Sequence, residues 1–156
     1  MVKRLALGLA MVSLLVGCAN GGTAAGTPGE SGADPVPVEQ VDGSWVVTAL
    51  AVDGSTVELL SDWPITLDVA DGRVSGRAPC NNYSGAVETD GSGGFSVAGV
   101  AATRKACLGP VMQIEQTYLA ALERVDRAIP TGGLTLTNAD TSVEIVLGAG
   151  APTPGG

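Results

Sequence analysis

The chain has 156 residues, with 16 acidic and eight basic side chains, no histidine and a net charge of −8 at pH 7. An acidic chain without a basic stripe is a poor candidate for binding nucleic acid, because that affinity comes mainly from cations that neutralise phosphates. Without histidine, the chain also lacks the base that Ser-His and Cys-His nucleophilic sites require.

The N-terminus resembles a bacterial lipoprotein signal. Lys3 and Arg4 give a positive start, Leu5–Val16 is mainly apolar, and the run ends in Leu-Val-Gly-Cys, whose cysteine such signals lipidate. A membrane-spanning helix needs ~20 apolar residues, more than this run offers. An ordinary secretory signal with a free cysteine is the alternative. We expect residues 1–17 to be a signal peptide and Cys18 to carry the lipid that holds the chain on the extracytoplasmic side of the cell membrane.

Residues 18–40 are expected to be the lipidated cysteine and a flexible linker. The stretch is rich in Gly, Ala and Pro, has no aromatic residue and cannot offset the entropy of ordering. Its r.m.s. reach is ~25 Å. Residues 148–156 have a similar composition and are expected to be a disordered tail, which leaves 41–147 as one domain. Losing the two signal cations lowers the net charge from −8 to −10, which disfavours electrostatic attachment to anionic lipid.

The domain contains mostly short β-forming runs separated by turn signals. Asp53-Gly54 and Asp71-Gly72 are dipeptides typical of tight hairpins. Residues 64–69 alternate between apolar and polar side chains, as a half-buried strand does. The expected strands are 45–52, 64–69, 73–77, 84–89, 95–100, 134–137 and 142–147.

One segment departs from this pattern. Pro110 precedes Val111–Arg127, in which apolar residues recur at three- and four-residue steps, and Pro130 follows it. This periodicity predicts one amphipathic helix. The expected fold is therefore α+β, a small antiparallel β-sheet packed by one amphipathic helix.

Two cysteines, Cys80 and Cys107, remain after the lipidated one. Outside the cytoplasm disulfides persist, and a bond between this pair would close a loop of 28 residues. The alternatives are a metal site, which lacks a Cys-x-x-Cys pair or histidine, and a reactive thiol, which lacks a base. We expect a structural disulfide and neither a metal nor a cofactor.

Around these cysteines the chain resembles the META domain (HslJ-like) family of bacterial envelope proteins. The motifs are Cys80–Gly85, Thr103–Cys107 and Glu115–Leu122, preceded by a tryptophan strand and an Asp-Gly-Arg-Val-Ser-Gly hairpin, and together they span residues 42–147. The resemblance implies a small α+β fold and an envelope or stress-response role, without a defined biochemical activity. Arg77–Pro79 stands where the family usually has glycines.

Five residues beside the cysteines are candidates for binding. Asn81, Asn82 and Tyr83 follow the first cysteine, whereas Arg104 and Lys105 are adjacent cations in an acidic chain. They could contact a ligand or a partner. The alternative reading is that the asparagines hydrogen-bond local backbone in a turn, that the cations are solvated, and that none of the five has a binding role.

The expected function is that of a lipid-anchored envelope protein whose domain binds and does not catalyse, in an envelope or stress-associated role. The alternative is an inhibitor of an extracellular hydrolase that presents a rigid loop near the disulfide. A hydrolase in its own right is a third reading. The expected partners are the membrane, through the lipid, and an envelope protein; we expect a monomer that does not bind nucleic acid.

Overall fold

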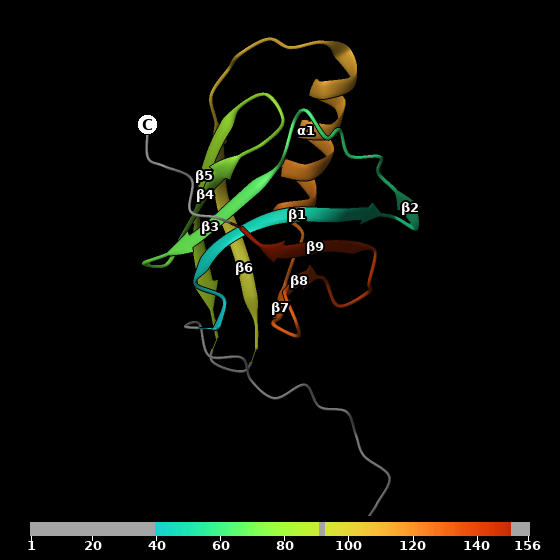
Figure 1. Ribbon diagram of the computed structural model, residues 1–156. Helices are drawn as coiled ribbons and strands as arrows, with labels where there is room; N and C mark the ends of the chain where they lie inside the picture. Colours follow the sequence, from blue (N-terminus) through green and yellow to red (C-terminus); the bar gives the residue numbers. More distant parts are fainter. Residues whose placement is uncertain (1–39, 91–92, 151–156) are drawn as a thin grey trace, which may run out of the picture. The chain divides into compact units, whose positions relative to one another are not determined.

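The structure is a computed structural model that describes residues 40–90 and 93–150 (Figure 1). The predictions for residues 1–39 and 151–156, which include the signal peptide and Cys18, lie outside the described residues. In chain order the elements are β1 (Gly43–Val52), β2 (Ser55–Thr56), β3 (Thr66–Ala70), β4 (Arg73–Arg77), β5 (Asn82–Thr89), β6 (Phe95–Ala102), α1 (Gly109–Leu122), β7 (Arg127–Ile129), β8 (Leu134–Thr137) and β9 (Val143–Ala149). None of the helices in this part of the chain is long and apolar enough to cross a membrane.

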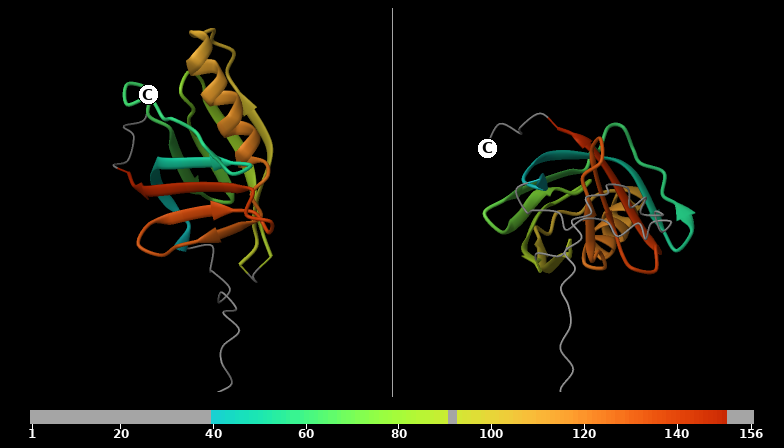
Figure 2. Two further views of the ribbon diagram at one scale, coloured as in Figure 1. Left: turned by 90° about the vertical axis from the view of Figure 1, so that its right-hand side faces the viewer. Right: turned by 90° about the horizontal axis from the view of Figure 1, so that it is seen from below.

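The strands form one nine-stranded antiparallel sheet in the order β6-β5-β4-β3-β1-β9-β8-β7, with β2 paired to β1. The sheet curls so far that its two edges meet, since Gly94 beside β6 bridges Arg127 in β7 and the Phe95 amide donates to the Asp126 carbonyl oxygen. Beyond this contact the edges diverge, and α1 lies in the opening (Figure 2). The result is a half-barrel with one helix in its concave side.

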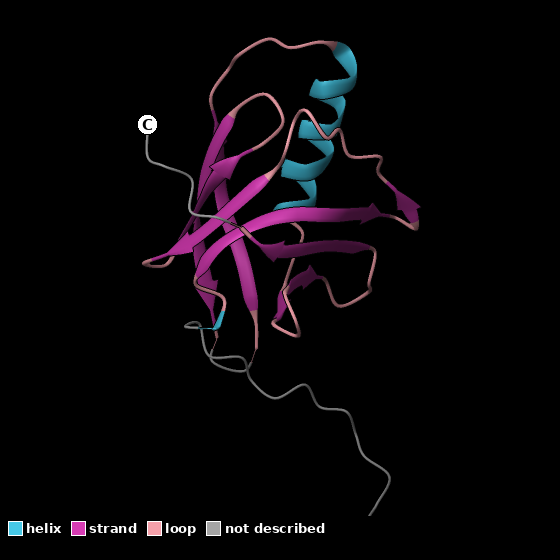
Figure 3. Cartoon of the chain, viewed as in Figure 1, coloured by secondary structure: helices cyan, strands magenta, loops and turns pink. Residues whose placement is uncertain are grey.

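The expectation of an α+β fold with a small sheet is therefore wrong. Among the described residues nine strands share one sheet and one α-helix has 14 residues, so this part of the chain is mostly β (Figure 3). The helix also ends at Leu122 and not at Arg127. The amide of Asp126 donates to the Thr137 carbonyl oxygen, which starts the pairing of β7 with β8 and draws the chain out of the helix.

The hairpin predictions are confirmed. Asp71 and Gly72 both have positive φ angles, 52° and 70°, and join β3 to β4. Asp53 and Gly54, at 51° and 76°, join β1 to β2 in the same way. Two consecutive left-handed residues match the right-handed twist of the flanking strands, which is why this dipeptide predicts the turn well.

The core fills the concave side of the sheet. Alternate residues of the strands point inward and meet the buried face of α1, to which Tyr118, Ala121 and Leu122 contribute. At the other end of the chain, β9 continues through Gly148 and Ala149, which pair with Val46 and Trp45. The ordered domain thus extends two residues beyond the expected boundary at 147.

Candidate functional site

The predicted disulfide is present. Cys80 and Cys107 are bonded, with their Cα atoms 6.1 Å apart. The bond ties the segment before β5 to the connection between β6 and α1. We call this connection, residues 103–108, the basic loop.

Asn81 fastens the same loop from inside the domain. Its side chain is buried, and Oδ1 accepts hydrogen bonds from the Thr103 hydroxyl (2.8 Å) and the Lys105 amide (2.7 Å). Its Nδ2 donates to the Lys105 carbonyl oxygen (3.3 Å) and to Glu115 Oε1 (2.6 Å). Two acceptor and two donor positions are all that an asparagine amide offers. The side chain is fully engaged within the protein.

Glu115 completes this network from the helix. The residue is only 4 % exposed, and its Oε2 accepts hydrogen bonds from the backbone amides of Cys80 and Asn81, both at 2.8 Å. An acidic residue in an amphipathic helix is usually expected on the exposed face. The buried residues Val111, Glu115, Tyr118 and Leu122 follow one another at steps of four, three and four, so the spacing itself carried a signal that this carboxylate faces inward.

Two buried tyrosines, Tyr83 of β5 and Tyr118 of α1, also join the helix to the sheet. The hydroxyl of Tyr83 donates to the Thr66 carbonyl oxygen (2.9 Å), which leaves the Tyr118 hydroxyl to donate to Tyr83 across 2.6 Å. The rings meet edge to face, with centroids 5.6 Å apart. Burial raises the pKa of Tyr118 and, aided by the neighbouring Tyr118, that of Tyr83, because the charged phenolate is poorly solvated there.

The remaining candidates lie on the surface. Asn82, Arg104 and Lys105 are exposed, and Leu108 is 77 % exposed at the end of the basic loop. The Asn82 backbone pairs with Thr103, since its carbonyl oxygen accepts from the Thr103 amide (2.9 Å). The structure thus gathers the predicted residues around the disulfide, but it buries Asn81 and Tyr83 and leaves the other three exposed.

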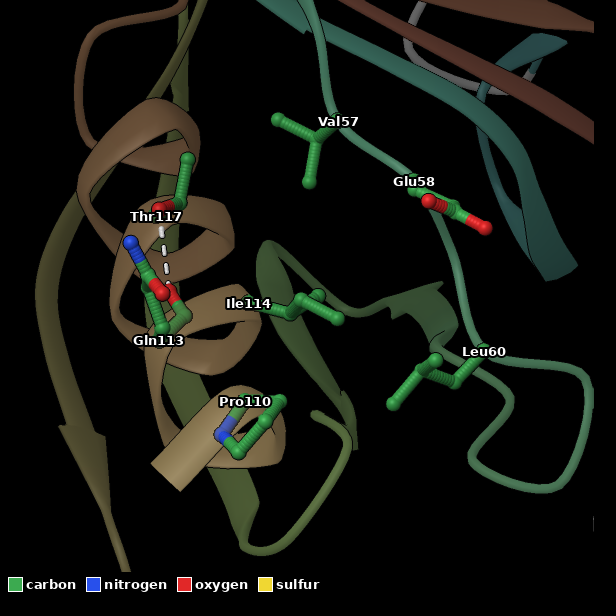
Figure 4. A pocket seen from close by; sticks show the side chains of 7 residues that line it. All are labelled: Val57, Glu58, Leu60, Pro110, Gln113, Ile114 and Thr117. Atoms are coloured by element: carbon green, nitrogen blue, oxygen red, sulfur yellow. Dashed lines mark hydrogen bonds between the residues drawn. The ribbon is translucent and has the colours of Figure 1, made fainter. Parts of the chain in front are cut away.

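The sequence did not indicate a groove that lies beside α1. This groove has a volume of about 390 Å³ and lies between the helix and the chain that follows β2 (Figure 4). Ile114 extends from the helix toward Leu60 on the opposite wall. The lining residues are Val57, Glu58, Leu60, Pro110, Gln113, Ile114 and Thr117. They come from two segments that are far apart in the sequence, which is why no local pattern indicated the groove.

Across 40–90 and 93–150, no three Cys, Asp or Glu side chains are grouped as metal ligands would be.

Comparisons with known proteins place this architecture in a family. The META domain matches residues 38–149. Among solved structures, an NMR structure of a protein from Burkholderia xenovorans is 25 % identical with a TM-score of 0.61, and the match covers 83 % of this chain and 98 % of that one. A DUF4847 family protein from Bacteroides vulgatus has the same fold at 12 % identity and a TM-score of 0.54, over 75 % of this chain and all of that one. A search of curated proteins found no match. Because the family match covers most of the chain, this protein belongs to the META domain family.

Proposed function

We propose that this chain is an HslJ-like lipoprotein held on the extracytoplasmic side of a bacterial membrane through Cys18, and that its META domain is a non-catalytic binding module of the cell envelope with a stress-associated role. The signal-like N-terminus supports the anchor. A second acyl chain on the cysteine would make the attachment durable, since one chain alone gives only marginal binding.

The observation that carries the binding role is the basic loop. It is exposed, yet the disulfide at Cys107 and the Asn81 side chain fix it from within. A loop that is already ordered loses little conformational entropy on binding, so more of its contact energy appears as affinity. Its exposed side chains combine two cations with the apolar Leu108, which suits a protein partner.

The place of the loop in the domain fits an anchored protein. The basic loop and the first described residues lie at opposite ends of the domain (Figures 1 and 2). A domain tethered through its N-terminus can therefore present this loop away from the membrane and toward other envelope proteins.

Two measurements in intact cells test the proposal. Mass spectrometry of the mature protein should find an acylated Cys18, and the Cys18→Ser variant should leave the membrane fraction. A photo-crosslinking residue at Ala106 in the basic loop should then capture a discrete partner. The matched control is the same residue at the exposed Ala139, in the turn between β8 and β9. A non-acylated wild-type chain would contradict the anchor, and equal capture from both positions would contradict the binding surface.

A further inference from the structure

The basic loop carries an arginine and a lysine in succession, and neither side chain forms an ion pair with any described residue. In the described part of the chain the one ion pair joins Arg124 to Asp53, on another part of the surface. No acidic residue occurs in the sequence between Asp90 and Glu115. Trypsin-like serine proteases cleave the peptide bond that follows an arginine or a lysine, and Arg104–Lys105 is such a bond between two exposed residues.

Such a protease binds its substrate as an extended strand. It pairs with the backbone of alternate residues, because an extended chain presents the N–H and C=O groups of every second residue on the same edge. The cationic side chain of the residue before the cleaved bond enters an acidic pocket. If Arg104 is that residue, the protease requires the backbone of Ala102, Arg104 and Ala106 to be free.

The free edge of the loop meets this requirement. The Thr103 amide donates to the Asn82 carbonyl oxygen, so the adjacent Ala102–Tyr83 pair is of the non-hydrogen-bonded kind, in which the N–H and C=O of Ala102 point away from β5. Within residues 40–90 and 93–150, the backbone amides of Arg104 and Ala106 form no hydrogen bond. Arg104 and Ala106 are both exposed.

The intervening residues are the ones that the domain holds. Thr103 is bonded through its amide and its hydroxyl, and Lys105 is bonded through both its amide (2.7 Å) and its carbonyl oxygen (3.3 Å) to Asn81. The loop therefore alternates between residues fastened to the domain and residues open to a partner. We propose that the basic loop is a substrate-like inhibitor of serine proteases that cleave after arginine or lysine, with Arg104–Lys105 as the bond presented to the enzyme.

The internal bonds explain why such a loop would inhibit and not simply be digested. Attack of the serine oxygen on the Arg104 carbonyl carbon breaks the C–N bond to Lys105, and the serine proton passes to the Lys105 nitrogen. That amine stays held by Asn81 and by the disulfide at Cys107, next to the new ester. It can attack the ester, re-form the peptide bond and return the proton to the serine. The complex then dissociates slowly, as expected of a preorganised loop.

The test is inhibition of trypsin by the mature chain, from residue 18 onward with Cys18→Ser and the interior disulfide formed. A small chromogenic arginine substrate reports the free enzyme. We expect one-to-one inhibition with a Ki of about 1 µM or lower. Arg104→Ala should weaken it by roughly 100-fold, since an arginine anchor is typical of an interface hot spot. Arg77→Ala, an exposed arginine of β4 outside the loop, is the matched control and should change the Ki less than about twofold.

Exchanging the side chain that enters the primary pocket of the protease gives a second test. Arg104→Phe should lose trypsin inhibition and inhibit chymotrypsin, whose primary pocket is a hydrophobic slot. No inhibition by the wild-type chain, turnover of Arg104–Lys105 at the rate of an ordinary substrate, or equal inhibition by the Arg104→Ala variant would overturn the inference. This inference rests on the domain being a binding module. The two proposals can still fail separately, because partner capture from Ala106 without trypsin inhibition would overturn only the protease assignment.

Discussion

Replacing Glu115 by glutamine should destabilise the domain although the side chain keeps its size. The carboxylate accepts three hydrogen bonds, from the amides of Cys80 and Asn81 and from Asn81 Nδ2. A glutamine retains one oxygen, which can serve the two backbone amides. Its NH₂ group must then face Asn81 Nδ2, which is also a donor. Asn81 cannot turn its amide over, because its Oδ1 already accepts from Thr103 and Lys105.

The size of the effect follows from these bonds. A hydrogen bond to a charged group contributes about 1.5–3 kcal/mol and a neutral one about 1 kcal/mol, so each backbone bond weakens by about 1 kcal/mol in the variant. Losing the third bond and leaving a buried donor without an acceptor costs about 2 kcal/mol more. The sum, about 4 kcal/mol, is a large share of the ~5–15 kcal/mol that stabilises a typical domain.

Urea unfolding measures this loss, with the fluorescence of the half-buried Trp45 and Trp63 as the probe. The midpoint should fall by roughly 1.3–4 M, which is about 4 kcal/mol divided by a urea m-value of about 1–3 kcal/mol per M. Glu123→Gln, at the exposed residue that caps the C-terminus of the same helix, is the matched control and should change the free energy of unfolding by less than about 0.5 kcal/mol. Adding Asn81→Asp restores an acceptor opposite the introduced glutamine, so the double variant should lose less than the sum of the single losses. A Glu115→Gln variant as stable as the wild type, or strict additivity, would refute the reasoning.

Three further predictions concern stability. Cys80→Ala and Cys107→Ala should each lower the free energy of unfolding by about 3.5 kcal/mol, and the double change should add little, because both remove one bond. The free energy of unfolding should fall as pH rises above about 10. Burial raises the pKa of Tyr83 and Tyr118, so both keep their protons in the folded chain at a pH at which they lose them in the unfolded chain. The slope reaches at most about 1.4 kcal/mol per pH unit for each tyrosine. Gly76→Ala should destabilise by more than about 2 kcal/mol, because its Cβ would overlap a backbone carbonyl of β3.

Urea unfolding of matched variants decides each of these three predictions. Clearly additive losses in the two cysteine variants would argue against a shared bond. An alkaline slope that is the same in the Tyr118→Phe variant would rule out the buried tyrosine as its cause. For the glycine, Gly109→Ala is the control, since a Cβ there meets no atom within 4 Å. Similar losses at both glycines would contradict a steric origin.

The features that the sequence predicted correctly are mostly local. The Asp71-Gly72 turn needs only two residues that tolerate positive φ. The disulfide could be predicted because only two cysteines remain in a chain that is expected outside the cytoplasm. The early end of the helix could not be predicted in this way. Val125 and Ile129 continue the apolar periodicity of α1. Pairing of β7 with β8 and burial of Val125 in the core nevertheless stabilise the fold more than another helical turn would. Long-range pairing overrides local periodicity in such segments.

The placement of Glu115 also explains how the fold and the surface are coupled. The carboxylate on α1 orders the chain at Cys80 and Asn81, and Asn81 in turn orders Lys105 in the basic loop. The exposed loop is therefore positioned by a buried charge on a helix, through one intermediate side chain. The disulfide fastens the same loop at a second point, so the loss of either support alone should loosen it without releasing it. Partner capture from Ala106 should therefore weaken in Glu115→Gln and in Cys107→Ala, and it should vanish only when both are changed.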